Sequence, residues 1–386
     1  MTKEELIKSF LESSKEKEKA IKYLMAHREE LRNNGIFINE NADNGTVFAF
    51  GNAEVSVHDE AKVYARDHAK VFAYDIARVS AHGNAKVFSR DNASVSAFDT
   101  AKLGTFGNAD VYADDEATVT AYGEVKVEAH GNARVYADGN AKVKAYEYAK
   151  VEAHDHASVY AHDIAEVYAH DEAKVEAHDI ARVSAHGNAK VFSRDHASVS
   201  AFDTVKVRTY GNADVYADDE ATVTAYGEAK VEAHDNARVY ADGNAKVKAY
   251  EYAKVEAHDH ASVKAYEYAK VEAFDNASVF AFDHAKVGTF GNARVFAHGN
   301  AEAYMNENTT VGAYNYSKVY AHNDAKAEAH YTADVIADDH AKVYAYDNAK
   351  VLAYDEATVF AYENAEVSAH DNARVSVHEN AECRRM

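Results

Sequence analysis

The chain has 386 residues, with no Pro, no Trp and a single Cys, yet it contains 27 Tyr and 22 His. One cysteine excludes a disulfide framework, and a formal net charge of −22 disfavours non-specific binding to nucleic acid or anionic membranes. No stretch resembles a signal peptide or a membrane-spanning helix, so we expect a cytoplasmic protein without a membrane partner. The skewed residue usage indicates that a few positions have been copied many times.

Residues 1–34 predict an α-helical cap or docking element. Thr2-x-x-Glu5 and Ser13-x-x-Glu16 match capping boxes, and Asn33-Asn34-Gly35 is typical of a helix end. We expect two helices, at about 3–12 and 14–33, which would cover the open end of the structure that follows. Six apolar side chains would lie over its first coil: Leu6, Phe10, Ile21, Leu24, Met25 and Leu31.

Residues 43–386 divide into 43 octads without an insertion, with the consensus [DG]-N-A-x-V-x-A-[HYF]. Val holds position five in 39 octads, and Ala is the commonest residue at positions three and seven. Apolar residues at alternate positions indicate a strand with one buried face, whereas a helix would turn this Val by about 80° per octad. Position one, with 22 Asp, 12 Gly and 6 Glu, is typical of a turn. Residues 35–386 therefore predict an all-β fold, a parallel β-solenoid of stacked octads.

The volume of the inward side chains favours two octads per coil. Three octads would enclose a triangular interior that Val and Ala fill poorly, whereas a flattened coil of two strands brings the thin layers into contact. Three strands per coil remain the alternative.

The octads resemble the tandem [DG]-x-A-x-V-x-A-x arrays found in uncharacterised bacterial and phage proteins, over about nine-tenths of the chain. They also distantly resemble the six-residue units of left-handed β-helices. The resemblance implies a β-solenoid and brings no catalytic residue with it.

A long segment is duplicated. Residues 75–162 recur at 179–266 with nine differences in 88 positions, a shift of 13 octads. Because thirteen is divisible by neither two nor three, the copied octads fall on a different face from their originals. We expect the octads to act as interchangeable spacers, since a site built across neighbouring coils of one face should not survive such copying.

Histidines concentrate at position eight, which holds 15 of the 22 and is His, Tyr or Phe in 33 octads. Rings at this position should stack on their neighbours one coil away. Such a ladder spreads its nitrogens along a line, so we expect no metal site, and without a GGxGxD motif we expect no calcium site. One run forms a candidate pH-sensitive ladder: His154, His162, His170, His178 and His186. With two octads per coil, the first, third and fifth of these share one edge and the other two share the opposite edge.

Residues 299–338 keep the eight-residue frame but lose the consensus. This segment is either a set of drifted repeats or a candidate interaction patch. The residues of that patch are Tyr304, Met305, Asn306, Tyr314, Tyr316 and Tyr331.

The sequence predicts a non-enzymatic structural or interaction protein. It contains no G-x-S-x-G, Walker loop, H-E-x-x-H or C-x-x-C motif. We expect a rigid acidic rod that acts as a scaffold, a spacer or a multivalent binding surface, with no cofactor and no small-molecule substrate. Its partner would be an unidentified protein or a second copy of the chain.

Two other functions stay open. The acidic surface could engage a basic partner, for example as a DNA mimic that inhibits a DNA-binding protein of a phage or bacterium. Acidic residues clustered at phosphate-like spacing would favour mimicry, whereas interspersed Lys would argue against it. Rows of outward Tyr and Phe could instead bind a glycan.

Overall fold

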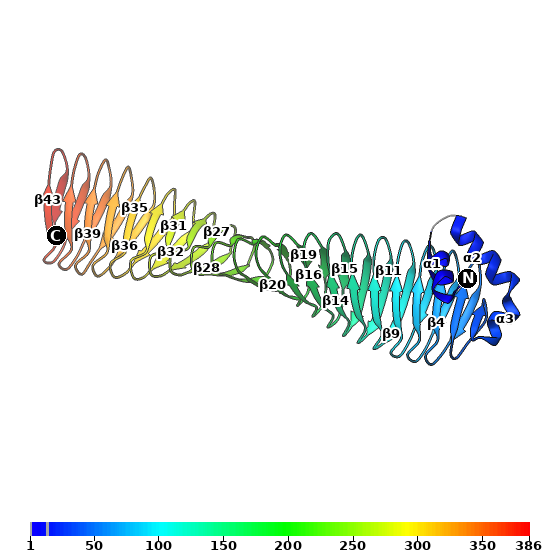
Figure 1. The fold of residues 1–386 in the computed structure, drawn as a ribbon. Helices are drawn as coiled ribbons and strands as arrows, with labels where there is room; N and C mark the ends of the chain where they lie inside the picture. Colours follow the sequence, from blue (N-terminus) through cyan, green and yellow to red (C-terminus); the bar gives the residue numbers. More distant parts are fainter. Residues whose placement is uncertain (1, 13–14) are drawn as a thin grey trace. The chain divides into compact units, whose positions relative to one another are not determined.

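The computed structural model describes residues 2–12 and 15–386 (Figure 1). Its helices are α1 (Lys3–Leu11), α2 (Lys15–Ala26) and α3 (Arg28–Asn33), and they precede a short strand, β1 (Ile36–Ile38). Each octad then contributes one strand, from β2 (Thr46–Ala49) to β44 (Glu382–Arg385), which covers octad positions four to seven. Three strands continue into the next turn: β9 (Lys102–Gly107), β11 (Thr118–Gly123) and β13 (Arg134–Gly139).

Strands pair in parallel with the strand sixteen residues further along the chain. In β14 (Lys142–Ala145) and β16 (Ser158–Ala161), for example, Val143 lies opposite Val159. Even-numbered strands form one sheet and odd-numbered strands from β3 (Glu54–Val57) onward form the other. The fold is a parallel β-solenoid of about 21 turns. The prediction of two octads per coil is confirmed, and the alternative of three is wrong.

The interior consists of the residues at positions three, five and seven. Val at position five is at most 4% exposed as far as Val367, and the Ala residues on either side are almost all fully buried. Positions four and six point outward, which gives most strands the same alternating burial. Small side chains are required because the two sheets of a flattened coil face each other directly.

Turns between strands depend on a left-handed residue at position one. From Gly51 onward, every residue at this position has a positive φ, between 47° and 61° for the residues that are not glycine up to Glu379. Gly adopts this conformation without steric cost, and Asp and Asn tolerate it better than most residues. This explains the Asp and Gly of the consensus.

The carboxylates at position one also link neighbouring coils. The Asp99 carboxylate accepts a hydrogen bond from the backbone N–H of Gly83 at 2.8 Å, and Glu363 accepts one from Asp347 at 2.8 Å. Because donor and acceptor lie sixteen residues apart, the acidic residues form a ladder along each edge.

Contacts within the chain define two compact units, Met1–Lys190 and Val191–Met386, and each is a stack of these coils. Strand β20 (Lys190–Ser193) crosses the boundary. In the first unit, the helices lie against the first coils (Figure 1).

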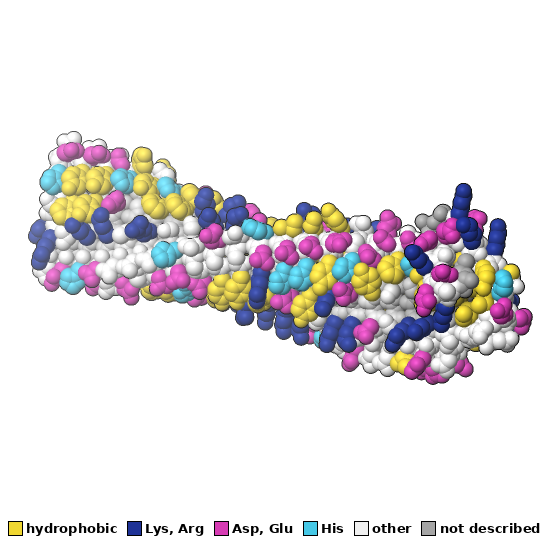
Figure 2. Space-filling view, in the orientation of Figure 1, with side chains coloured by type: hydrophobic (Ala, Val, Ile, Leu, Met, Phe, Trp, Pro, Cys, Tyr) yellow, Lys and Arg dark blue, Asp and Glu magenta, His cyan; other side chains and the backbone are white. Residues whose placement is uncertain are grey.

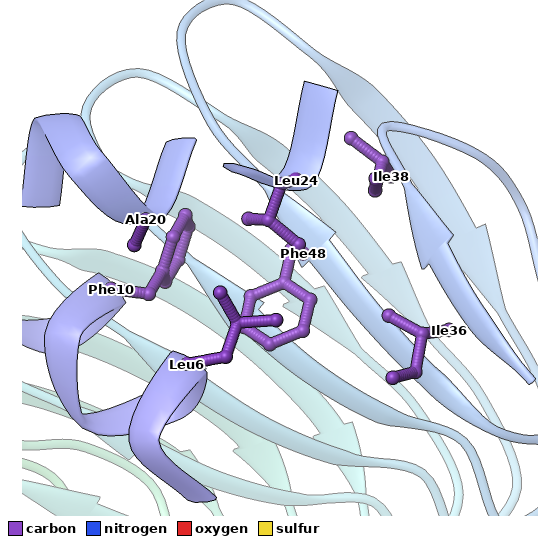
Figure 3. Packing of buried hydrophobic residues seen from close by; sticks show 7 residues of the cluster. All are labelled: Leu6, Phe10, Ala20, Leu24, Ile36, Ile38 and Phe48. Atoms are coloured by element: carbon purple, nitrogen blue, oxygen red, sulfur yellow. The ribbon is translucent and has the colours of Figure 1, made fainter. Parts of the chain in front are cut away.

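The helical cap buries one apolar face against the solenoid (Figure 3). Leu6, Phe10 and Leu24 are at most 1% exposed, as predicted, while Ile21 and Leu31 are partly buried beside them. Phe10 meets Phe48 edge to face, with ring centroids 5.0 Å apart. Sequence reasoning missed four buried members of this cluster: Ala20, Ile36, Ile38 and Phe48.

Two details of the predicted cap are wrong. Met25 is 52% exposed, because α2 turns Ala20 and Leu24 inward and the residue after Leu24 faces solvent. The predicted second helix is two helices, since His27 leaves helical geometry at φ −113° and its ring Nδ1 lies 3.0 Å from the Tyr23 carbonyl oxygen.

The ends of the helices follow the predicted signals where the structure describes them. The capping box of Thr2 and Glu5 is confirmed, and the chain leaves α3 at Asn34 and Gly35, whose φ is +71°. The box predicted at Ser13 lies outside the described residues.

Candidate functional site

Rings at position eight form stacked columns along the edges of each unit. His58 stacks on Tyr74 and Tyr346 on Tyr362, with ring centroids 4.6 and 5.1 Å apart and interplanar angles of about 10°. The predicted stacking is confirmed. These columns explain why His, Tyr and Phe substitute for one another at this position.

The histidine run lies on two edges of the first unit, as predicted. His154 stacks on His170 at 4.8 Å, and His170 stacks on His186 at 5.6 Å. On the opposite edge, His162 stacks on His178 at 4.9 Å. Burial, followed by the charges of His154 and His186, lowers the pKa of His170, so protonation of the middle ring of the triplet is disfavoured.

A carboxylate that sequence reasoning missed joins this triplet. Glu152, at position six of β15 (Lys150–Ala153), places Oε1 3.2 Å from Nε2 of His154. One ligand atom from each of Glu152, His154 and His170 lies within 4.8 Å of the other two. The spacing of the ladder nitrogens alone gives no sign of this cluster. The signal present in the sequence is a Glu two residues before a His, because both side chains then point outward from the same strand end.

A groove crosses the outer face of the even-numbered sheet in the first unit. It has a volume of about 420 Å³ and extends over five strands, from β8 (Ser94–Ala97) to β16. Side chains at positions four and six form its walls, and the strand backbone at the inward-facing Val residues forms its floor. The charged and hydroxyl groups that line it are Ser94, Ser96, Asp110, Tyr112, Lys126, Glu128, Lys142, Lys144 and Tyr160.

Cations outnumber carboxylates in this groove, with three Lys against Asp110 and Glu128. Lys126 lies 3.7 Å from Asp110, whereas Lys142 and Lys144 form no ion pair with any described residue. This excess of positive charge is confined to the groove, because the whole chain carries a net charge of −22. Figure 2 shows this pattern on one face of the molecule, where Lys and Arg gather in short runs beside rows of Asp and Glu.

A matching groove of about 490 Å³ lies in the second unit, on the odd-numbered sheet. It spans β21 (Ser198–Ala201) to β29 (Ser262–Ala265), the copies of the strands that form the first groove. Lys264 replaces Tyr160 in the second groove, which Ser262 also lines; the other lining residues are identical. Local geometry is also repeated: Tyr112 donates a hydrogen bond to Asp114 at 3.2 Å, as Tyr216 does to Asp218 at 3.3 Å.

Contrary to expectation, this groove, which is built across neighbouring coils of one face, survives the copying. A shift of 13 octads moves every residue of the groove by the same amount, so partners that are sixteen residues apart stay sixteen residues apart. Because thirteen is odd, the copy changes sheet but keeps its internal arrangement. A site can thus be duplicated whole.

The residues of the predicted interaction patch are not brought together as one surface. Met305, the last residue of β34 (Glu302–Met305), is fully buried in the interior, so the prediction that it contacts a partner is wrong. Its Sδ atom lies 3.3 Å from Oγ1 of Thr289 on the neighbouring coil. Tyr304 lies on the outer sheet face, stacked on Tyr320 at 4.7 Å, and Asn306 lies at the turn after β34.

The remaining three tyrosines lie in turns that lead into the even-numbered sheet. Tyr314 stacks between His298 and His330, at 4.6 and 5.2 Å. Tyr316 and Tyr331 are exposed in successive turns along that edge. They form a short aromatic row at one corner.

None of the described helices has the length and apolar character required to span a bilayer. Comparison of the chain with protein-family models, curated proteins and solved structures gives no match.

Proposed function

We propose that this protein is a non-enzymatic binding scaffold whose two lysine-lined grooves each dock an acidic segment of a protein partner. The observation that carries this proposal is the repetition of one groove in both units, with all but one lining residue unchanged. Stacked coils supply a rigid support, and the outward positions supply the groups that a partner would contact. Two copies of one groove make the surface multivalent.

The chemistry of the grooves suits carboxylates. In the first groove, Lys142 and Lys144 flank Val143 on one strand, while Lys126 lies opposite Lys142 on the neighbouring strand. Like charges on adjacent strands repel each other, and a bound carboxylate would relieve that repulsion. The floor has no free strand edge, so an acidic peptide would be held by side chains and not by strand addition.

The distribution of charge argues against a DNA mimic. Lys or Arg occupies position four in 25 of the 43 octads, so cations run down the outer faces between the acidic edges. Several position-one carboxylates are already used as acceptors by the backbone of the neighbouring coil. Interspersed cations and engaged carboxylates make a poor imitation of a phosphate backbone.

A glutamate-rich peptide tests the proposal by isothermal titration calorimetry on the full chain. We expect two peptides per chain for the wild type and one for the variant with both Lys142→Ala and Lys144→Ala. The equivalent pair, Lys246→Ala with Lys248→Ala, should remove the other site. Combining all four substitutions should abolish binding.

Lys150→Ala is the matched control, because Lys150 also occupies position four but lies outside both grooves and pairs with Glu166 at 2.8 Å. It should leave the stoichiometry at two. Tyr160→Lys adds to the first groove the cation that Lys264 supplies in the second, and it should strengthen binding in the first groove. Undiminished binding to the fourfold variant would contradict the proposal, and tighter binding of an oligogalacturonate than of the peptide would favour a glycan ligand instead.

A further inference from the structure

Glu152, His154 and His170 bring an oxygen and two nitrogens to one edge of the first unit. Their potential ligand atoms all lie within 4.8 Å of one another, and all three side chains are half-buried. We propose that these three residues bind a single divalent transition-metal ion of the Zn²⁺ class. Imidazole nitrogen and carboxylate oxygen are the ligands that such ions take up in proteins.

The octad geometry explains why the three groups meet. His154 and His170 follow β15 and β17 (Glu166–Ala169), which are neighbours in the odd-numbered sheet, so their rings stack at 4.8 Å. Glu152 lies two residues before His154 and therefore projects from the same outer face. Its carboxylate reaches the Nε2 edge of the His154 ring at 3.2 Å.

A second carboxylate lies beside the other ring nitrogen of His154. The Nδ1 atom of its ring lies 3.7 Å from Oδ2 of Asp171, on the side opposite Glu152. Asp171 is itself held by the backbone N–H of Asp155, at 3.5 Å. Histidines that bind metals commonly direct their second ring nitrogen at a carboxylate, which fixes the ring and makes the ligating nitrogen more basic.

Binding requires only side-chain movement. Ligands about 2.1 Å from a tetrahedral ion lie about 3.4 Å apart, so the histidine nitrogens must approach each other by rotation of their rings. The side chains of His154 and Glu152 are 39% and 42% exposed, which leaves room for that rotation and gives an ion access from solvent. With three protein ligands, water would complete the coordination.

The end of the duplicated segment and the octads that follow it contain a natural control. Glu256 and His258 repeat the first pair, with Oε1 and Nε2 2.9 Å apart, and Asp275 lies 3.6 Å from the other ring nitrogen. Phe274 replaces the third ligand and stacks on His258 at 4.7 Å. Exchange of His for Phe at this position is therefore compatible with the column.

Zinc binding to the full chain, measured by equilibrium dialysis and by Co²⁺ absorption spectra, tests the proposal. We expect His170→Phe to lose one equivalent of tightly bound Zn²⁺ and the corresponding Co²⁺ absorption. Phe274→His should gain one equivalent, because it completes the same set of ligands in the second unit. Asp171→Asn should keep the site but weaken it by about 10–100-fold, as removal of a carboxylate behind a ligating histidine generally does.

All of these variants share the other histidines. Differences between the variants therefore report this site and not weak zinc binding elsewhere. Equal zinc stoichiometry in the wild type and His170→Phe would overturn the proposal, as would Phe274→His without an added equivalent. Circular dichroism of His170→Phe and Phe274→His should match the wild type, since both substitutions place a residue already found in the ring columns. The result is independent of peptide binding, because none of these residues lines either groove.

Discussion

At position one, each residue must adopt a left-handed backbone and can also offer a carboxylate to the coil before it. Asp meets both requirements, and Gly meets only the first. Tyr331 adopts the left-handed backbone, with φ +58°, at the cost of strain, and it is 56% exposed. It has no carboxylate to accept a hydrogen bond from the backbone N–H of Asn315, which holds position one in the preceding coil. This position is the clearest departure from the octad rule.

Tyr331→Asp should therefore stabilise the second unit. Relief of left-handed strain and an added hydrogen bond to the Asn315 N–H should together contribute about 1–2 kcal/mol to the free energy of unfolding. Urea unfolding followed by circular dichroism measures the change. Tyr316→Asp is the control, because its φ is not positive and its aromatic ring is also exposed; equal effects of the two substitutions would contradict the strain argument.

His298 makes the stability of its ring column dependent on pH. Its ring stacks between Phe282 at 5.4 Å and Tyr314 at 4.6 Å, and burial lowers its pKa. Below the pKa of a free histidine, the unfolded chain binds this proton more readily than the folded chain does, so stability should fall as the pH decreases below about 6.5. His298→Phe should reduce the loss of thermal stability between about pH 7.5 and pH 5.5. Phe282→Tyr, which leaves the histidine in place, should retain the full loss.

At the scale of secondary-structure elements, Arg66 joins helix α1 to the solenoid. It occupies position eight, where a ring is usual, but it is only 8% exposed, and its Nη1 donates hydrogen bonds to the carbonyl oxygens of Phe10 and Glu12 at 2.7 and 2.6 Å. Those carbonyls lie at the C-terminal end of α1, where no further turn of helix satisfies them. The guanidinium therefore fixes the cap in place as well as packing against it.

Arg66→Ala should destabilise the first unit by about 2–3 kcal/mol, because it leaves two carbonyls without a charged donor. Protection of the α1 amides in hydrogen exchange should fall with it. Arg90→Ala is the matched control: Arg90 holds the same octad position, but it is exposed and lies over the Phe106 ring at 5.7 Å. An equal loss of stability in both variants would show that the helices do not depend on Arg66.

The strands could be predicted in detail from the sequence, but the face of α2 could not. Alternating apolar residues and the volumes of Val and Ala are enough to define the inward positions and the sixteen-residue coil. In α2, by contrast, Ala20–Leu24 and Ile21–Met25 are both apolar pairs at helical spacing, and only packing against Phe48 selects the first. The Glu152 cluster was missed for a similar reason, since its members belong to different octads and meet only through side-chain direction.

At the scale of the whole molecule, the duplication shifts each copied octad by 13 positions in the series of octads. Because this number is odd, each copied strand belongs to the sheet opposite that of its original. The first groove lies on the even-numbered sheet and its copy on the odd-numbered sheet. An even number of octads would have placed both grooves on the same sheet. A copied groove thus moves to the other sheet by repetition alone, because each coil contacts only its neighbours.

Charge is the other property that belongs to the whole chain, and histidine makes it adjustable. Protonation of all 22 His with the carboxylates still ionised would change the formal charge from −22 to 0. Burial lowers the pKa of His82, His170 and His298, so these three should be among the last to gain a proton. Loss of net repulsion should then cause the chains to associate between about pH 6 and pH 5.

Static light scattering between about pH 8 and pH 5 measures this association. Replacing His154, His162, His170, His178 and His186 with Tyr keeps rings in both columns but removes five of the added charges. The variant should therefore remain dispersed to a lower pH than the wild type, while both stay dispersed at about pH 8. Scattering that is unchanged across this range in the wild type, or identical in the two proteins, would show that histidine charge does not control association.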